Sequence, residues 1–228
     1  MSSLNEIKLK TFINSREIYP DENIEGICRL SGVNLNKKLH NISIYIKTNY
    51  IKDKYKNIGG KKVVLQKVEI DLDKSLNEGG LVTVPFKFKV SSKVPVSIHK
   101  SHVWIKTCLK ENGKNKLEEK YHIDILPPKY IENTINIIEN LGFSLTEVEN
   151  KYIENKYDNM PFIQCFKFRK VKEDLDENKN EIEIFFKQKN DFIEVYLNYN
   201  IKVTFEYKYI NDLNYLTNKI YSVIKLKI

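Results

Sequence analysis

Alanine is absent from this 228-residue sequence, and arginine occurs only three times among 38 basic residues. The shortage of arginine argues against recognition of phosphates or bases by bidentate hydrogen bonds, for which the planar guanidinium is suited. A chain rich in Lys, Asn and Ile without Ala is typical of an AT-rich genome. This bias by itself accounts for part of the formal net charge of +8.

Long apolar runs and paired cysteines are also missing. No uninterrupted apolar stretch approaches the ~18 residues of a membrane-spanning helix, and the start MSSLNEIKLK lacks the apolar segment of a signal peptide. The three cysteines, Cys28, Cys108 and Cys165, are odd in number and far apart. This spacing suits neither a disulfide framework nor a zinc site, so we expect reduced thiols in a cytoplasmic protein without a transmembrane segment.

The common catalytic and cofactor-binding motifs are absent as well. The sequence contains no G-x-S-x-G, no P-loop and no dinucleotide-binding glycine pattern. His99, His102 and Cys108 lie in one stretch, but in a strand His102 and Cys108 would be roughly 20 Å apart, too far to share a zinc ion. The sequence therefore predicts no catalytic, cofactor-binding or metal-binding residues and a protein that is not an enzyme. An enzyme with an unusual site in a cleft between two halves stays an alternative.

The first 126 residues alternate between apolar and polar positions, as half-buried strands do. In VTVPFKFKV, residues Val82, Val84 and Phe86 share one side and lysines occupy the other. Pro85 cannot donate to a strand ladder, so it indicates an edge strand or a bulge. Similar runs recur between turns that contain Gly or Pro. Seven short strands with reversals between them predict an antiparallel β-sandwich over residues 1–126.

The periodicity changes after Pro127-Pro128. The segment KYIENTINIIENLGF predicts a connecting helix within residues 127–145. Gly142 suits the left-handed position that follows a helix end. The apolar residues expected on one face of this helix are Ile131, Ile135, Ile138 and Leu141.

Residues 146–228 return to strand-like alternation. Four runs, FIQCFKF, EIEIFF, FIEVYLNY and IKVTFEY, predict a second β-rich, sandwich-like domain. Leu213, Leu216, Ile220 and Val223 follow with helical spacing and indicate a short closing helix, for which Asn211 is the candidate cap.

Seven lysines gather in residues 47–67 against one aspartate, with Tyr50 and Tyr55 among them. One interpretation is an electrostatic site for phosphates or anionic lipid, at which the tyrosines stack. Another is a solvated hairpin tip, whose lysines discourage aggregation at a sheet edge. We prefer the hairpin tip, since charge runs usually mark solvated surface. The alternative function is a basic module that binds nucleic acid or an anionic membrane, through a surface formed by Lys52, Lys54, Lys56, Lys61 and Lys62.

Three segments, taken in order, resemble a known family. EIYPDENIEGICRLSG resembles the strand–turn–strand signature of arrestin-like domains, and LVTVPFKFKVSSKVPVSIHKSHVWIKTCL resembles the middle of the same domain. YHIDILPPKYIENTINIIENLGF, followed by PFIQCFKF, resembles the continuation found in the sporulation-control proteins (stage zero, M-type) of endospore-forming bacteria. The matches span about residues 15–170, and their order carries the resemblance.

The resemblance implies a mainly β protein with an arrestin-like sandwich, a connecting helix and a second β-rich half. It also implies a non-enzymatic adaptor that acts through protein–protein interaction in the control of early sporulation, with other proteins as partners. Gly26, Pro85, Pro95 and Trp104 are structural residues in this interpretation. The short tail, rich in Tyr and Asn, departs from the family pattern, so no C-terminal interaction is carried over. Sheet edges would also allow a homodimer.

Overall fold

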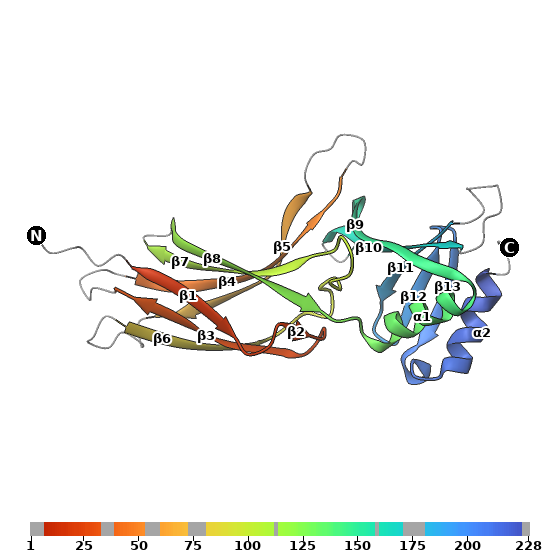
Figure 1. Cartoon of the computed structure of the whole chain (residues 1–228), viewed down its shortest axis with the longest axis horizontal. Helices are drawn as coiled ribbons and strands as arrows, with labels where there is room; N and C mark the ends of the chain where they lie inside the picture. Colours follow the sequence, from red (N-terminus) through yellow and green to blue (C-terminus); the bar gives the residue numbers. More distant parts are fainter. Residues whose placement is uncertain are drawn as a thin grey trace, which may run out of the picture. The chain divides into compact units, whose positions relative to one another are not determined.

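The computed structural model is a mainly β chain that divides into two compact units (Figure 1). The first unit comprises Met1–Asn49, Lys62–Ser97 and His102–Leu126, and the second comprises Tyr50–Lys61, Ile98–Ser101 and Pro127–Ile228. The structure describes residues 7–32, 39–52, 60–72, 81–111, 114–157, 160–170 and 181–224. The predicted mainly β fold class is confirmed.

Two sheets build the first unit. The three-stranded sheet has the order β1-β3-β6, with β1 (Lys8–Ile13), β3 (Asn23–Ser31) and β6 (Leu81–Lys89). The five-stranded sheet has the order β2-β8-β7-β4-β5, with β2 (Glu17–Ile18), β8 (Lys114–Ile125), β7 (Val103–Glu111), β4 (Leu39–Tyr50) and β5 (Lys61–Asp71). β2 runs parallel to β8, whereas β7 is antiparallel to both β4 and β8. These strands form the predicted β-sandwich.

The core of the first unit follows from the alternation of its strands. In β6, Val82, Val84 and Phe86 are buried and the residues between them are exposed. In β4, Ile42, Ile44 and Ile46 are at most 1% exposed. Each such apolar side chain contributes about 1.5–3 kcal/mol when it is removed from water. A period of two therefore produces one buried face on each strand, and these faces meet in the sandwich core.

Pro85 lies in an edge strand, which is one of the two positions that the sequence predicts for it. β6 is the last strand of the order β1-β3-β6, and Pro85 is paired with Ile27 on β3. A proline in a central strand would leave a ladder position without its N–H donor, whereas an edge tolerates it. The position of Pro85 therefore fits its chemistry.

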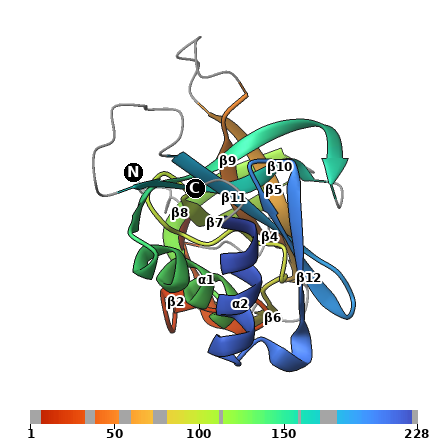
Figure 2. The same cartoon turned by 90° about the vertical axis from the view of Figure 1, so that its right-hand side faces the viewer.

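One antiparallel sheet and two helices build the second unit. The sheet has the order β13-β12-β11-β10-β9, with β9 (Phe143–Tyr157), β10 (Met160–Lys170), β11 (Glu181–Gln188), β12 (Phe192–Leu197) and β13 (Ile201–Glu206). The helices α1 (Lys129–Asn140) and α2 (Leu213–Ile224) lie side by side (Figure 2). A short 3-10 helix, η2 (Tyr207–Tyr209), precedes α2. The β-rich character predicted for residues 146–228 is confirmed. In the described part of this unit, helices accompany the five-stranded sheet and no second sheet is seen.

Helix α1 has the predicted place and ends. Pro128 precedes its first residue with φ −63°, and Gly142 follows its end with φ +88°. The left-handed value at Gly142 is one that residues with a side chain rarely adopt. The buried face differs slightly from the prediction, because Thr134 and Ile137 are buried and Ile135 is only half-buried. The sheet contacts the helix through aromatic side chains, such as Phe186 against Tyr130.

Helix α2 confirms the predicted closing helix, but its N-cap is not Asn211, the residue that the sequence indicates. The carboxylate of Asp212 accepts a hydrogen bond from the backbone N–H of Tyr215 at 3.0 Å. Asp212 is therefore the N-cap, and Asn211 lies one residue before it. Leu216, Ile220 and Ile224 are buried. Within the described residues, no helix has the length and apolar character needed to cross a membrane.

Strand β9 was not expected from the sequence. The segment 127–145 is helical only over Lys129–Asn140, and β9 begins at Phe143. It pairs with β10 from Phe143 to Tyr152 and again at Tyr157. The remaining edge of β9 is partly covered by two segments of the same unit, since Ile51 donates to the carbonyl of Asn150 at 2.8 Å and Lys100 donates to that of Val148 at 3.2 Å.

Candidate functional site

The structure places only part of the predicted lysine surface. Lys54 and Lys56, with Tyr55, lie outside the described residues. Lys52, Lys61 and Lys62 are exposed. Lys52 and Lys61 belong to the second unit and Lys62 to the first. An anionic partner for these lysines therefore stays a prediction.

Lys52 and Tyr50 already have partners within the second unit. The Lys52 ammonium lies 4.9 Å from the centre of the Tyr152 ring, a cation–π contact. The Tyr50 ring is stacked at 6.0 Å on Tyr152 and at 6.1 Å on Phe162. An aromatic ring engaged on its own protein is not available to stack on a base. The proposed stacking role of Tyr50 therefore loses its support.

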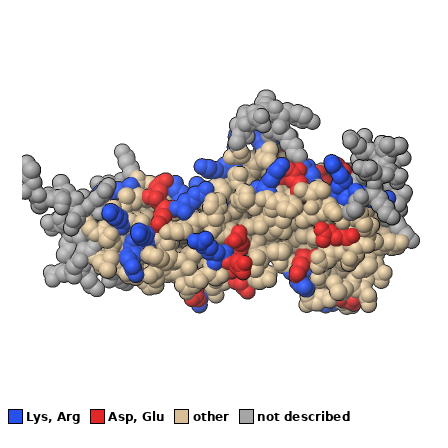
Figure 3. All heavy atoms as spheres, in the orientation of Figure 1, with Lys and Arg blue, Asp and Glu red and all other residues tan. Residues whose placement is uncertain are grey.

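Carboxylates accompany the lysines on the molecular surface. Figure 3 shows Lys and Arg side chains next to Asp and Glu on the visible face of the molecule. In β5, Lys67 lies 2.7 Å from Glu69, which Lys110 also approaches at 3.2 Å. Hydrogen bonds from these two ammonium groups lower the pKa of the Glu69 carboxyl to about 2. Such pairing reduces the field that a nucleic acid or an anionic membrane would experience.

The stretch with His99, His102 and Cys108 does not assemble a site. His99 lies before β7 in a left-handed conformation, with φ +49°. His102 is exposed, and its ring lies 6.4 Å from that of His122. Cys108 is fully buried, and its Sγ donates to Glu118 Oε1 at 3.8 Å. Within the described ranges, no three His, Cys, Asp or Glu side chains come together so that they could hold a metal ion.

Trp104, the single tryptophan, packs on its own sheet. Its side chain is 5% exposed, and the Lys120 ammonium lies 4.3 Å from its ring centre. The His122 ring lies opposite Trp104 on β8. The structural role that the family resemblance implies for Trp104 fits this burial.

A cavity of about 250 Å³ lies in the first unit beside β2 and the start of β3. Its lining includes Glu17, Glu22 and Glu25, so the cavity is acidic and repels anions. Two of these carboxylates have partners: Glu22 accepts the backbone N–H of Tyr19 at 3.1 Å, and Glu25 pairs with Lys87 at 2.6 Å. The cavity gives no support to a phosphate-binding function.

A carboxylate connects the two sheets of the first unit. Glu119 Oε2 accepts the backbone N–H of Thr11 on β1 at 2.5 Å, and Glu119 Oε1 accepts the Tyr121 hydroxyl at 2.5 Å. Burial, with this hydrogen bond, raises the pKa of Tyr121 to about 12. Thr11 is paired with Cys28 on β3. Its backbone N–H points to Glu119 and takes no part in the hydrogen bonds between β1 and β3. Glu119 therefore covers part of the free edge of β1.

All three thiols are buried and without disulfide partners. Burial raises the pKa of Cys28 to about 11 and that of Cys165 to about 12. It also raises the pKa of Cys108. Because the thiolate is the reactive form, these cysteines have the character of packing residues.

We expect the folded protein to leave a colorimetric thiol reagent unreacted at about pH 8, since the thiols are protonated and shielded there. All three should react at once in denaturant. The measurement compares the absorbance change in buffer with that in concentrated urea. Rapid release of one equivalent from the folded protein would show that one cysteine is accessible, contrary to its burial.

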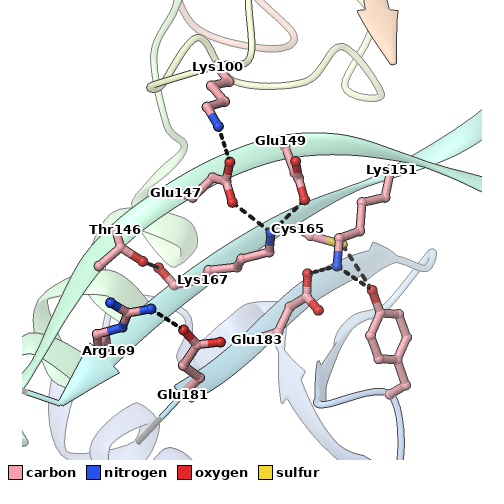
Figure 4. A network of polar contacts seen from close by, with 11 residues as sticks. Lys100, Thr146, Glu147, Glu149, Lys151, Cys165, Lys167, Arg169, Glu181 and Glu183 are labelled. Atoms are coloured by element: carbon pink, nitrogen blue, oxygen red, sulfur yellow. Dashed lines mark hydrogen bonds and ion pairs between the residues drawn. The ribbon is translucent and has the colours of Figure 1, made fainter. Parts of the chain in front are cut away.

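A charge network covers part of one face of the sheet in the second unit (Figure 4). We use this name for six residues, Lys100, Glu147, Glu149, Lys151, Lys167 and Glu183. Five of them lie on the neighbouring strands β9, β10 and β11, and Lys100 comes from the segment Ile98–Ser101. Three acids and three bases balance each other, so the network has no net charge.

Lys167 is the centre of the charge network. Its ammonium donates to Glu147 Oε2 at 2.7 Å and to Glu149 Oε1 at 2.6 Å. The Glu149 side chain is 1% exposed and that of Lys167 17%. The register explains the contact, because Lys167 is opposite Glu147 on β9 and opposite Glu183 on β11. A buried carboxylate of this kind requires a cation and hydrogen bonds.

Tyr199 joins the charge network from the loop after β12. Its φ of +66° is unusual for a residue with a bulky side chain. Its hydroxyl lies 3.2 Å from the Lys151 ammonium, which also pairs with Glu183, and 3.6 Å from Cys165 Sγ. Burial raises the pKa of Tyr199. A protonated phenol beside a protonated thiol is a poor nucleophilic centre, so the arrangement favours a structural role.

Exposed apolar side chains concentrate near the C-terminal end of the described chain. Of the nine large apolar residues that are strongly exposed in the described ranges, four lie between residues 207 and 221. We call these four the tyrosine surface: Tyr207, Tyr209, Leu213 and Tyr221. Tyr209 stacks on Tyr215 at 5.0 Å, and the Lys208 ammonium lies 4.7 Å from the Tyr209 ring. The family resemblance seen in the sequence implies no interaction for this C-terminal segment.

Comparison with known proteins agrees with the fold. A family model described as SpoOM protein matches residues 5–203. A curated relative, sporulation-control protein spo0M of Bacillus subtilis (strain 168), is 22% identical over 194 residues, which are 85% of this chain and 75% of the relative. The crystal structure of Spo0M from Bacillus subtilis superposes with a TM-score of 0.79 at 20% identity, over 97% of this chain and 99% of that one.

Proposed function

The chain belongs to the SpoOM protein family, and we propose that it is a non-enzymatic regulator of early sporulation that acts by binding other proteins. The name of the Bacillus subtilis relative, a sporulation-control protein, supports the regulatory role. In this proposal the first unit is an arrestin-like sandwich that serves as an adaptor. The protein acts in the cytoplasm, in keeping with its three free cysteines.

The tyrosine surface carries the proposal that the protein binds others. Leu213 is 55% exposed, Tyr221 41% and Tyr209 40%. Tyrosine and other large side chains are enriched at the centre of protein–protein interfaces, because they bury much area and lose little conformational entropy. Large apolar side chains that are exposed to water also cost solubility, which a binding role compensates.

The charges around the tyrosine surface indicate the kind of partner. The ammonium groups of Lys208 and Lys219 lie over the rings of Tyr209 and Tyr215. A partner protein that presents apolar side chains bordered by carboxylates would match the rings and Lys219, since Lys208 already pairs with Glu206 at 3.0 Å. Tyr215 has a structural task, since its hydroxyl approaches the backbone of Thr204 and Glu206 at 3.4 Å.

Replacing Tyr209 and Leu213 together with serine should lower the recovery of partner proteins by about tenfold, because truncation of interface anchors commonly has this effect. The measurement is affinity capture with cross-linking at the start of sporulation, quantified by mass spectrometry. Tyr19→Ser is the matched control, because Tyr19 is 45% exposed but lies in the first unit. Its partner recovery should equal that of the wild type.

Two results would count against this proposal. Equal recovery from the double variant and the control would place the contact elsewhere on the molecule. Unchanged timing of sporulation after deletion of the gene would contradict the regulatory role itself. These outcomes are separate, so the surface and the function can fail independently.

A further inference from the structure

The three-stranded sheet of β1, β3 and β6 has an inner face in the sandwich core and an outer face toward water (Figure 1). Thr11 and Cys28, which are opposite each other on β1 and β3, are at most 1% exposed and belong to the inner face. Side chains alternate between the two faces of a strand. Phe12, which is 44% exposed, and Leu81, which is 56% exposed, therefore lie on the outer face.

The strand register arranges the outer residues in rows across the sheet. Phe12 is opposite Ile27, and Ile27 is opposite Pro85, so one row is apolar on all three strands. Ile27 is half-buried, whereas Pro85 is exposed. The guanidinium carbon of Arg29 lies 5.2 Å from the centre of the Phe12 ring. The apolar row is therefore in contact with a charged row.

The charges on the outer face are almost all positive. Lys10 is opposite Arg29, and Lys8 lies on the same side of β1 as Lys10. All three side chains are exposed. The three strands contain one carboxylate, that of Glu25, and Lys87 pairs with it at 2.6 Å. Among the described residues, no carboxylate forms an ion pair with Lys8, Lys10 or Arg29, so these three charges are not compensated locally.

We infer that this face binds the surface of an anionic lipid membrane. We call it the basic face and define it by Lys8, Lys10, Phe12, Arg29 and Leu81. The three cations lie at the lipid headgroups, and the two apolar side chains enter the boundary between headgroups and acyl chains. Basic residues near such a surface are attracted by its negative potential, which the cytoplasmic leaflet of a membrane provides. Apolar burial and charge attraction then act together on one face.

Composition favours a membrane over an acidic protein as the partner of the basic face. Protein–protein interfaces are depleted in lysine relative to the rest of the surface, whereas two of the three free cations here are lysines. A lipid surface does not require carboxylates at fixed positions, since the field of many headgroups attracts a flexible ammonium group. The basic face lies in the first unit and the tyrosine surface in the second. The inference is therefore independent of the proposed function.

Removing the three charges is the first test. The variant that combines Lys8→Gln, Lys10→Gln and Arg29→Gln should bind anionic vesicles roughly 100-fold more weakly than the wild type, because each basic residue contributes about fivefold. The measurement is co-sedimentation of the full chain with vesicles of phosphatidylcholine and phosphatidylglycerol at low salt. Vesicles of phosphatidylcholine alone should bind the wild type weakly. Salt should weaken the binding to the anionic vesicles.

The matched control removes the same charge from the lysine surface that the sequence indicates. The variant with Lys52→Gln, Lys61→Gln and Lys62→Gln should bind the anionic vesicles within about threefold of the wild type, since only the long-range field changes. Thermal unfolding of both triple variants checks that the exposed substitutions leave the fold intact.

Three outcomes would overturn the inference. A wild-type chain that does not bind the anionic vesicles has no membrane face. An equal loss of binding in the two triple variants would mean that net charge acts without a defined face. Binding to soluble polyglutamate, with no binding to vesicles, would show that the basic face receives an acidic protein.

A fluorescent label tests the orientation separately. Phe12→Cys introduces an exposed thiol for a polarity-sensitive dye, and the native cysteines are buried. The emission of this label should shift to shorter wavelength when the anionic vesicles are added, because the side chain leaves water. Lys120→Cys is the matched control, since Lys120 is exposed on the other sheet of the same unit, and its label should not shift. A shift at position 120 without one at position 12 would contradict the basic face.

Discussion

Replacing Lys167 with methionine is expected to lower the free energy of unfolding by about 3 kcal/mol. Lys167 donates to Glu147 and Glu149 at 2.7 and 2.6 Å, and the Glu149 side chain is 1% exposed. Methionine preserves the length of the side chain but removes the ammonium group. The carboxylates would then stay buried without this cation, and denaturant unfolding of the variant and the wild type measures the cost.

The same strand provides the control. Arg169 lies two residues along β10 and pairs with Glu181 at 2.6 Å, but both side chains are more than half exposed. Arg169→Met should therefore cost only ~0.5 kcal/mol, since water solvates both charges. If Lys167→Met destabilises the protein no more than Arg169→Met does, the charge network is not a stabilising element.

A double variant separates charge from packing. Adding Glu149→Gln to Lys167→Met removes one of the carboxylates that lost its cation. We therefore expect the double variant to recover part of the stability, with a coupling energy of about 1–2 kcal/mol between the two positions. Strict additivity of the two single effects would mean that Lys167 acts through its packing alone.

Gly26→Ala is expected to destabilise the first unit by about 3 kcal/mol or more. A Cβ at this position would lie 2.2 Å from the carbonyl oxygen of Phe12 and 2.6 Å from Cζ of Phe86. Gly26 is paired with Ile13 on β1 and with Phe86 on β6. Because one of the two atoms belongs to the backbone, the extra carbon can fit only if β1 moves. Thermal and denaturant unfolding measure the effect.

Gly142→Ala distinguishes this clash from a general cost of replacing glycine. Nothing lies within 4 Å of a Cβ at Gly142, and only its φ of +88° opposes the change. The expected cost is about 1 kcal/mol, from the backbone conformation alone. Phe86→Leu, added to Gly26→Ala, should recover little, because the contact with the Phe12 carbonyl remains. Equal stability of Gly26→Ala and the wild type would contradict the close approach seen in the structure.

The strands of the first unit could be predicted because one face of each is buried. Val82, Val84 and Phe86 alternate with exposed residues in β6, and the sequence displays this period directly. Pro85 indicated an edge or a bulge, since its missing N–H is tolerated only where no partner needs it. The helix α1 was equally accessible, because Pro128 and Gly142 mark its two ends.

Strand β9 could not be predicted from its own residues. Glu147, Glu149 and Lys151 lie on one of its faces, and charged residues at alternate positions usually indicate a solvated strand or a loop. Their partners are Lys167 and Glu183, on strands that lie many residues further along the chain. Only the register of β9 with β10 and β11 makes these charges part of a folded sheet.

For the candidate surfaces too, the sequence shows one part and only the folded structure shows the rest. The lysine-rich segment was visible in the sequence, but the engagement of Lys52 and Tyr50 with Tyr152 was not. The tyrosine surface could not be recognised either, because alternation and spacing do not say which aromatic residues stay exposed. A count of exposed side chains in the folded chain identified Tyr209 and Leu213.

By itself, the sequence determined the elements whose cause is local: alternating strands, the ends of α1, and cysteines suited to packing. Tertiary structure alone decided the burial of Glu149 beside Lys167, the close approach at Gly26 and the edge position of β5. The physical reason is that the alternation of apolar residues and the residues that form turns depend only on a few neighbours in the sequence. Ion pairs, clashes and strand order depend on residues that only folding brings together.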